Sequence, residues 1–414
     1  MSDVIVGLDI GTSAIRAVVA EKLETGMLQI IGVGTAVSQG LRKGAVVNIE
    51  KTVQGIHEAV ETAEMMSGIE ITHCITGIGG THIEGINSRG IVAVTAKGKS
   101  NREIDQQDID RVIEAAKAVV IPMDRRVMHV VPQSYIVDDQ RGIKDPHNMI
   151  GVRIEAEVHI VTGSVTCVRN IVDCVKRANL NVNDFMYHGL AAVKSVMTEE
   201  EQELGSVLID IGGGTTDIVV MSDGAPVFTA VLPVGGNHAT NDLAIVKGLS
   251  VETAEKLKIS DGRCWLPLVE DNEQVLISAP GGRAPVQIAK FDICEILQAR
   301  MAEIFTMVKD KIAPVSASNR FAGNVILCGG GSLMPGTTEL ASEIFGTASV
   351  RLGIPGTFGG LTGEYRSPEF AAVLGLILSQ YKPHGAAGEE KGNAENEPGK
   401  IFGKIKGLWR NLFE

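Results

Sequence analysis

The sequence lacks features that several broad classes of protein require. No stretch of 18 uncharged apolar residues occurs, and the N-terminal MSDVIVGLDIG has no basic segment before an apolar one, so we expect neither membrane spanning nor export. The six cysteines stand singly, without a C-x-x-C pair, which predicts reduced core residues in a cytoplasmic protein. Because 38 basic residues face 50 acidic ones, the net charge of −12 argues against a general nucleic-acid binder.

Motifs of several common enzyme sites are also missing. The chain has no Walker A motif, no G-x-S-x-G elbow for a serine nucleophile, and no H-x-x-x-H or H-E-x-x-H pair among its nine histidines. We therefore assign no catalytic residue and no histidine-based metal site. What the 414 residues do offer is enough length for two to four domains with a large apolar core.

A glycine-containing unit occurs twice. Three apolar runs, Val4 to Ile10, Ile15 to Ala20 and Leu28 to Val37, are separated by turn residues and predict a three-strand meander. The pattern recurs from Ser206, and LDIGTSAIRAVV aligns with IDIGGGTTDIVV at a constant offset of 201 residues. Solenoid units repeat every 20 to 50 residues or so, hence this spacing instead predicts two related domains that face each other as two lobes.

The stretches between and after the two copies divide the chain further. Separate strand and helix signals predict an inserted small α+β subdomain within the first lobe and a second insertion, with a long helix, within the second lobe. Small, polar and acidic residues near the C-terminus predict a disordered linker. The expected division is a first lobe at 1–84 and 162–198, the inserted subdomain at 85–161, a second lobe at 199–235 and 325–381, the second insertion at 236–324, the linker at 382–399 and a terminal helix at 400–414.

The two glycine turns are the strongest candidates for binding phosphate. Each follows a buried strand, and its backbone N–H groups are free to point at phosphate oxygens, while Asp9 and Asp210 are expected to hold Mg²⁺ through its waters. One such turn alone can simply close a hairpin, but paired copies at matched positions favour a nucleotide site between the lobes. The candidate residues are Asp9, Gly11, Thr12, Ser13, Asp210, Gly212, Gly213, Gly214, Thr215 and Thr216.

Two weaker signals point to the adenosine end of a nucleotide. The segment VILCGGGSLMPG enters a turn at Gly329, Gly330, Gly331 and Ser332, where bare backbone allows an adenine or ribose to lie flat. In AEKLK, Glu255 and Lys258 lie three apart on one helical face and are candidates for bonds to ribose hydroxyls or the base edge. A surface ion pair is the commoner explanation of such a pair.

The ordered set of two phosphate hairpins and a glycine-rich adenosine loop resembles the superfamily of actin, hexokinase and heat-shock chaperones. The phrases HVVPQSYIVDDQRGIKDP, GVRIEAEVHIVTG, LIDIGGGTTDI and SPEFAAVLGLIL resemble, more closely, the FtsA family of bacterial cell-division proteins over essentially the whole chain. That resemblance implies an α/β, actin-like fold with duplicated ATPase-type domains, in which the insertion at 85–161 is an SHS2-like subdomain, called 1C, that replaces the usual actin subdomain. The extra glycine in Gly329 to Ser332 departs from some members.

The same resemblance implies a function. The family binds ATP with Mg²⁺, polymerises on the inner face of the cell membrane, captures the C-terminal tail of the tubulin-like FtsZ in the Z ring, and recruits later divisome proteins. Arg300 and Glu303 match positions where the family binds the FtsZ tail, although a salt bridge within the helix explains them equally well. Expected partners are therefore the FtsZ tail, further copies of the chain, divisome proteins and anionic lipid, but no nucleic acid.

Alternatives from other classes remain open at this stage. A small-molecule kinase of the superfamily would use the same nucleotide motifs, yet we see no general base, so a scaffold with at most slow ATPase activity is the leading hypothesis. A pilus-assembly adaptor of the PilM type resembles the FtsA family in fold and insertion. The terminal segment distinguishes the two.

The last fifteen residues, KIFGKIKGLWRNLFE, predict an amphipathic helix that lies in a membrane surface. At about 100° per residue its apolar side chains fall within one arc, while four basic residues oppose a single acidic one. A helix of this length reaches about 22 Å, too short to cross a bilayer but suited to lie on one. The candidate membrane-binding residues are Ile401, Phe402, Ile405, Leu408, Trp409, Arg410, Leu412 and Phe413.

Overall fold

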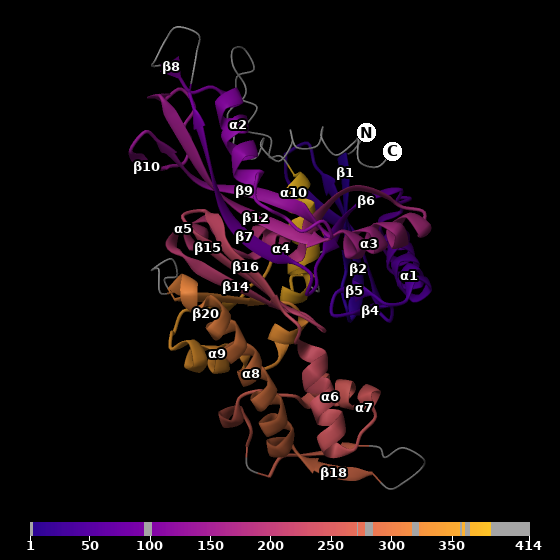
Figure 1. Ribbon diagram of the computed structural model, residues 1–414. Helices are drawn as coiled ribbons and strands as arrows, with labels where there is room; N and C mark the ends of the chain where they lie inside the picture. Colours follow the sequence, from indigo (N-terminus) through magenta and orange to yellow (C-terminus); the bar gives the residue numbers. More distant parts are fainter. Residues whose placement is uncertain are drawn as a thin grey trace.

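A computed structural model of the chain describes residues 3–94, 102–270, 272–277, 285–316, 323–356, 358–360 and 365–381. Two lobes, each built on a twisted β-sheet, lie side by side, and an inserted subdomain and a helical subdomain extend at opposite ends (Figure 1). This is the two-lobed architecture that the repeated unit predicts, and the α/β, actin-like fold that the family resemblance implies. Within the described residues, no helix combines the length and the apolar character needed to cross a membrane.

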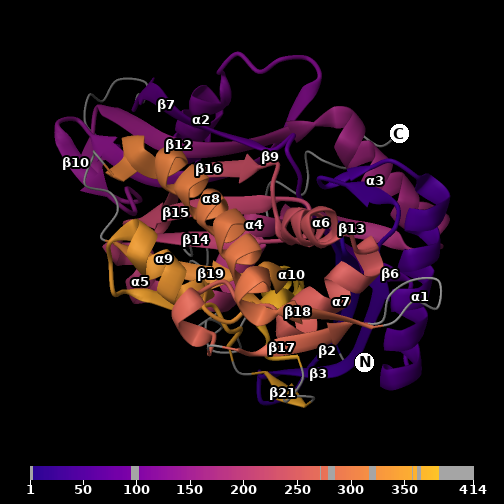
Figure 2. The same cartoon turned by 90° about the horizontal axis from the view of Figure 1, so that it is seen from below.

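The first lobe contains the first copy of the repeated meander. Its sheet has the order β13-β6-β1-β2-β3-β21, with α1 and α3 on one side and α4 and α10 on the other (Figure 2). Helix α10 lies close against α4 because Gly375 has no side chain to strike the backbone of Ala191. The elements are β1 (Asp3–Ile10), β2 (Ala14–Lys22), β3 (Leu28–Val37), β4 (Leu41–Arg42), β5 (Ala45–Val46), α1 (Ile49–Ser67), β6 (His73–Ile78), α3 (Val165–Arg177), β13 (Asn181–Tyr187), α4 (His188–Val196), β21 (Gly359–Gly360) and α10 (Ala371–Gln380).

The inserted subdomain leaves the first lobe after β6 and returns to it at α3. Four antiparallel strands in the order β10-β9-β12-β7 pack against α2, whose start is fixed by a capping box between Asp105 and Asp108. Its apolar core is separate from that of the lobe. The elements are β7 (Glu84–Ala93), β8 (Arg102–Glu103), α2 (Gln106–Lys117), β9 (Arg125–Val137), β10 (Gln140–Ile143), β11 (Ile150–Gly151) and β12 (Arg153–Ser164).

The second lobe repeats the meander and carries a helical subdomain. Its sheet has the order β16-β15-β14-β19-β20, and the long helix α8 covers it with its apolar side. The acidic run that starts at Glu199 forms the short exposed helix α5. The elements are α5 (Glu199–Leu204), β14 (Ser206–Ile211), β15 (Thr216–Ser222), β16 (Ala225–Leu232), α6 (Gly236–Lys247), α7 (Val251–Asp261), β17 (Gln274–Ile277), β18 (Val286–Ala289), α8 (Lys290–Ser316), β19 (Asn324–Cys328), α9 (Thr337–Phe345) and β20 (Val350–Leu352).

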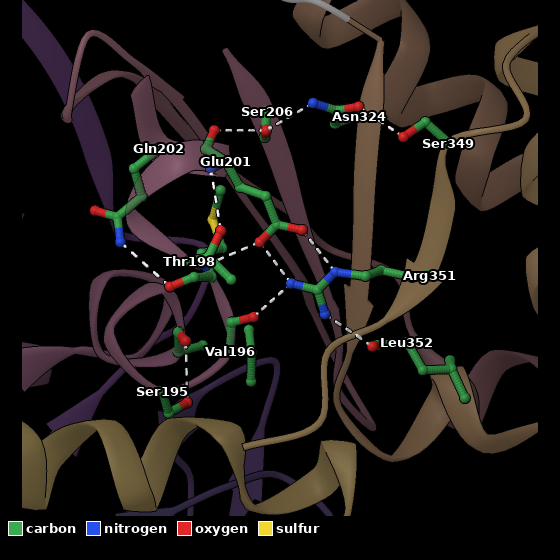
Figure 3. A network of polar contacts seen from close by, with 12 residues as sticks. Ser195, Val196, Thr198, Glu201, Gln202, Ser206, Asn324, Ser349, Arg351 and Leu352 are labelled. Carbon is green, nitrogen blue, oxygen red and sulfur yellow. Dashed lines mark hydrogen bonds and ion pairs between the residues drawn. The ribbon is translucent and has the colours of Figure 1, made fainter. Parts of the chain in front are cut away.

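Polar contacts tie the two chain crossings between the lobes together, and Figure 3 shows those around Arg351 and Glu201. Arg351, on β20, binds the Glu201 carboxylate with two nitrogens, each at 2.6 Å, and also donates to the carbonyl of Val196 at the end of α4. On the other crossing, the Ser195 hydroxyl donates to the carbonyl of Ala371 at 2.6 Å, and the Gly356 N–H donates to the Ser195 carbonyl. The network thus ties the two lobes together where the chain passes between them.

Candidate functional site

The two glycine turns have the same local geometry. In the first, the Gly11 N–H donates to the Ala14 carbonyl at 3.0 Å, and in the second the Gly212 N–H donates to the Thr215 carbonyl at 2.9 Å. Each turn joins two antiparallel strands, β1 to β2 and β14 to β15. The duplicated sequence therefore folds twice into the same hairpin, once in each lobe.

The turns of the two lobes touch each other. The Ser13 hydroxyl donates to the Asn237 side chain at 2.9 Å, and a Cβ built on Gly213 would lie 1.9 Å from the same hydroxyl oxygen. A Cβ on Gly214 would lie 2.8 Å from Thr12, whose own hydroxyl accepts a bond from the Gly44 N–H. Glycine is thus required at both positions for the lobes to meet as they do.

Beneath the turns, a cavity of about 120 Å³ lies between the lobes. Its wall includes residues of both turns, the buried carboxylates and the start of the loop after β19. Those named by the sequence that line it are Asp9, Gly11, Thr12, Ser13, Asp210, Gly212, Gly213, Thr215, Gly329 and Gly330. The structure therefore brings together residues 9 to 13, 210 to 215 and 329 to 330, which lie far apart in the chain.

Three predicted residues near this cavity turn away from it. Thr216 is fully buried and donates to the Val234 carbonyl, and Ser332 is 1 % exposed and donates to the Gly329 carbonyl. Gly331 packs against Ile211. These side chains and this glycine hold the turns in shape rather than facing the cavity.

Glu255 and Lys258 lie beside the second turn but outside the cavity wall. The Lys258 ammonium contacts the Glu255 carboxylate at 2.7 Å, the Thr240 hydroxyl at 2.8 Å and the Gly236 carbonyl at 3.3 Å. The pair therefore connects α7 to the first turn of α6, the helix that follows the second hairpin.

Four ionisable side chains at the cavity form one electrostatic unit. The Nε2 atom of His188 lies 3.1 Å from Oδ1 of Asp9, an ion-pair distance, although the orientation of the two groups does not complete a hydrogen bond. Burial alone would lower the pKa of His188, but Asp9, with Asp217 and Asp210 beyond it, raises that pKa to about 9. Burial would raise the pKa of Asp9, yet His188 and Arg16 hold it below its usual value.

The two aspartates from the second lobe have raised pKa values, in contrast to Asp9 of the first lobe. Burial and the neighbouring Asp217 carboxylate raise the pKa of Asp210 to about 7, and burial raises the pKa of Asp217 to about 6. One oxygen of Asp217 is buried without a hydrogen-bond partner. The site thus holds carboxylates whose ionisation is costly without a nearby cation. A bound cation would favour their ionised form.

Sequence reasoning missed His188, Asp217 and Arg16 as cavity residues. A signal exists for two of them, because Asp9 pairs with Arg16 and Asp210 pairs with Asp217 at the same register of the duplicated hairpin. His188 has no comparable signal. It opens α4 directly after β13, and only the folded structure, which puts its ring in the cavity wall beside Asp9, shows that it belongs to the site.

Arg300 and Glu303 lie on α8, away from the cavity. Arg300 binds the Asp242 carboxylate on α6 through Nε at 2.5 Å and Nη2 at 3.0 Å, and it also pairs with Glu303. Its side chain is 25 % exposed. The contact with an FtsZ tail that the resemblance implies for Arg300 stays a prediction, and this side chain also ties α8 to α6.

The predicted membrane-binding residues from Ile401 to Phe413, with the linker before them, lie outside the described residues. Among the residues that are described, no three or more His, Cys, Asp or Glu side chains are grouped to hold a metal ion directly.

The sequence matches two protein-family models. The model described as cell division protein FtsA matches residues 207–375, and the model described as an SHS2 domain inserted in FtsA matches residues 80–162. The chain is also 40 % identical over 407 residues to the cell division protein FtsA of Borreliella burgdorferi, covering 98 % of each chain. It is 42 % identical over 374 residues to FtsA of Pseudomonas aeruginosa, covering 90 % of this chain and 88 % of that one.

Solved structures share the fold at low sequence identity. The PilM-PilN type IV pilus biogenesis complex contains a chain with a TM-score of 0.66 and 17 % identity, covering 92 % of this chain and 99 % of that chain. MreB5 of Spiroplasma citri, solved bound to ADP, gives a TM-score of 0.53 and 14 % identity, covering 91 % of this chain and 96 % of that chain. Both likenesses establish the actin-like fold.

Proposed function

Because this chain belongs to the FtsA family of actin-like cell division proteins, we propose that it binds ATP with Mg²⁺ between its two lobes and acts as a scaffold at the division site. The observation that supports nucleotide binding most directly is the pair of matched glycine turns facing each other over buried carboxylates. MreB5, which shares the fold, was solved with ADP.

The residues around the cavity suit a magnesium nucleotide. Backbone N–H groups of the two turns, with the Ser13 and Thr215 hydroxyls, would receive the phosphates, and the Gly329 to Gly330 backbone would face the adenosine. Asp9 and Asp210 would hold Mg²⁺ through its waters, since hard oxygen ligands are what this ion prefers. The ion would supply charge neutralisation for the phosphates and for the buried carboxylates.

The closed contact between the turns adds a requirement. A cavity of about 120 Å³ is smaller than the several hundred Å³ of a typical small-molecule site. The Ser13 to Asn237 hydrogen bond must therefore break, and the lobes must separate, before a triphosphate enters. We propose that the lobes separate by rotating about the two chain crossings beside Arg351.

Nucleotide binding is tested by thermal unfolding. Saturating ATP·Mg²⁺ should raise the melting temperature of the full chain, because a ligand that binds only the folded state stabilises it by mass action. Asp210→Ala should reduce this shift, whereas the exposed Asp139→Ala should keep it. If saturating ATP·Mg²⁺ leaves the melting temperature of the wild-type protein unchanged, the proposed nucleotide site is wrong.

We also propose that the terminal segment attaches the protein to the membrane. Its support is the sequence pattern alone, with an apolar arc, four basic residues and an acidic linker before it. One short helix binds anionic lipid weakly, so firm attachment should need several copies presented together by a filament of this chain. In this arrangement the protein would tether FtsZ filaments at the inner membrane face and recruit later divisome proteins.

Vesicle flotation tests the tether and the partner together. Full-length protein should float with anionic vesicles, more strongly with ATP·Mg²⁺, and should carry an FtsZ tail peptide with it. Trp409→Glu with Phe413→Glu, or deletion of residues 400–414, should leave the protein at the bottom while the ATP-induced thermal shift persists. Flotation of the truncated protein would place the tether elsewhere.

A further inference from the structure

The inserted subdomain hydrogen-bonds to the second lobe, although the chain joins it to the first. On one side of the contact, Asn87 Nδ2 donates to the Val227 carbonyl at 2.9 Å and Gln133 Nε2 donates to the Pro226 carbonyl at 2.8 Å. At the same place, His159 Nε2 and the Thr229 hydroxyl lie 3.0 Å apart. Strands β7, β9 and β12 thus rest on β16, a strand of the other lobe (Figure 1).

The centre of this contact, at His159 and Thr229, is buried and closely packed, whereas Asn87 at its edge is exposed. His159 is 1 % exposed and Thr229 is 3 % exposed, and the other ring nitrogen of His159 lies 2.6 Å from the Asn87 side-chain oxygen. A Cβ built on Gly85 would stand 2.1 Å from the Thr229 hydroxyl, so the strand approaches only because this residue is glycine. Buried polar groups that are all paired resist separation, because any that lose a partner pay the full cost of desolvation.

A second attachment joins the inserted subdomain to the turn of the hairpin formed by β15 and β16. Lys144, in the loop after β10, donates to the carbonyl of Asp223 in the turn between β15 and β16. The inserted subdomain therefore touches the β15–β16 hairpin at its turn and along β16.

The near end of that hairpin is fastened to the second glycine turn. Strand β15 starts at Thr216, directly after the turn, and the Thr216 hydroxyl donates to the Val234 carbonyl that follows β16. Next, the Gly236 N–H donates to the Gly212 carbonyl and the Asn237 N–H to the Gly213 carbonyl. One hairpin therefore runs from the proposed phosphate site to the inserted subdomain.

We propose that the inserted subdomain moves with the second lobe when the cleft opens, and that the β15–β16 hairpin transmits the state of the second glycine turn to it. The movement then takes place where the subdomain meets the first lobe, at the Tyr187 N–H bond to the His129 ring and the packing of Met128, rather than at the buried contact with β16. The coupling to nucleotide rests on the ATP binding proposed above, but the attachment to the hairpin does not.

The first experiment measures which lobe the inserted subdomain follows. Spin labels are placed at three exposed positions, Glu61→Cys on α1, Gln140→Cys on β10 and Glu343→Cys on α9, in pairs, in full-length protein. Five native cysteines are buried, so Cys167→Ser is a sufficient background. Upon adding ATP·Mg²⁺, the distances from 61 to 343 and from 61 to 140 should shift together, while the distance from 140 to 343 stays constant.

The opposite pattern overturns the proposal. A constant distance from 61 to 140, with a shift from 140 to 343, would show that the inserted subdomain follows the first lobe. If ATP·Mg²⁺ raises the melting temperature but changes none of the three label-to-label distances, the nucleotide site exists but the coupling to the inserted subdomain does not. A missing thermal shift would instead count against the nucleotide site itself.

The second experiment needs no nucleotide. Hydrogen exchange is compared between wild type, the double variant Asn87→Ala and Gln133→Ala, and the control Gln107→Ala, an exposed glutamine on α2 of the same subdomain. Amides of β15, β16 and residues 212–215 in the double variant should exchange about fivefold or more faster, as expected for the loss of a net hydrogen bond or two. Faster exchange confined to residues 84–164 would overturn the transmission through the hairpin.

Discussion

His188 Nε2 lies 3.1 Å from Asp9 Oδ1 in the wall of the cavity between the lobes. Among the described residues of this wall, His188 and Arg16 are the two basic side chains beside three buried aspartates. The raised pKa of His188 means that the folded protein holds the imidazolium more tightly than the unfolded chain does. In the nucleotide-free protein, His188 therefore supplies part of the positive charge that the aspartates require.

Replacing His188 with glutamine should destabilise the nucleotide-free protein near pH 7 by on the order of 1 to 3 kcal/mol. The contribution of the imidazolium is fully present below about pH 6.5 and is lost as the pH rises through about 9. Urea unfolding at pH 6, 7 and 9.5 checks this, with the exposed His57→Gln as control. A difference from wild type that is equal at all three values would assign the effect to packing against Gly77 and Gly79.

Asp210→Asn and Asp217→Asn should each stabilise the metal-free protein at pH 8 but not at pH 4. In the folded protein the pKa of Asp210 is about 7 and that of Asp217 is about 6, both above the ordinary 3.8. The stability that the protonated carboxyls contribute is therefore fully present below pH 3.8 and is lost as the pH rises through these folded pKa values. Melting temperatures in EDTA should rise by a few degrees at pH 8, and the response to ATP·Mg²⁺ should fall. Equal stabilisation at both pH values would show that the carboxyls are not costly to ionise.

Gly213→Ala should prevent the two turns from meeting. Its methyl group would collide with the Ser13 side chain, so the turns could not close again over bound phosphates and the thermal shift with ATP·Mg²⁺ should shrink. Gly359→Ala is the matched control, because a Cβ there meets nothing closer than 3.6 Å and the residue lies on β21, outside the cavity wall. Calorimetry of both variants with and without nucleotide makes the comparison. The prediction fails if Gly213→Ala responds to ATP·Mg²⁺ as wild type does.

Arg300→Glu should lower stability as well as any affinity for the FtsZ tail. The new carboxylate would face Asp242 and Glu303, and like charges in a half-buried position cost of the order of 1 to 3 kcal/mol. Glu303→Gln keeps the tie to Asp242, hence it separates the two effects. Tail-peptide titration and thermal unfolding of both variants give the measurement. Unchanged stability in Arg300→Glu would mean that the bond between α8 and α6 contributes nothing.

The parts of the fold that the sequence predicts well are those that depend on neighbouring residues. The apolar run at Val4 to Ile10 is strand β1 with little change in its limits, the pattern expected from Ser206 begins β14, and the long helix expected in the second insertion is α8. Local periodicity and glycine punctuation fix such elements. The duplicated turn could be found because its two copies can be compared within one chain.

The parts that escaped prediction depend on residues that meet only in three dimensions. His188 reaches Asp9 across 179 positions of sequence, and Arg300 finds Asp242 on another helix, so no local pattern announces either pair. The same holds for His159 and Thr229. Thr216 and Ser332 show the converse, since each belongs to a predicted loop but its hydroxyl closes the local backbone instead of facing the cavity.

The hydrogen bond between Ser13 and Asn237 has a consequence for the rates at which a nucleotide would bind and leave. On the entry route proposed above, a nucleotide would be captured only by the open fraction of molecules, so its apparent affinity would be reduced by that fraction. Association should therefore level off at high ATP concentration, at the rate at which the turns part, instead of rising without limit as in a diffusion-controlled encounter. Once the turns have closed again over the phosphates, the same gate would delay escape, and residence time would be set by the lobes rather than by the strength of any single contact.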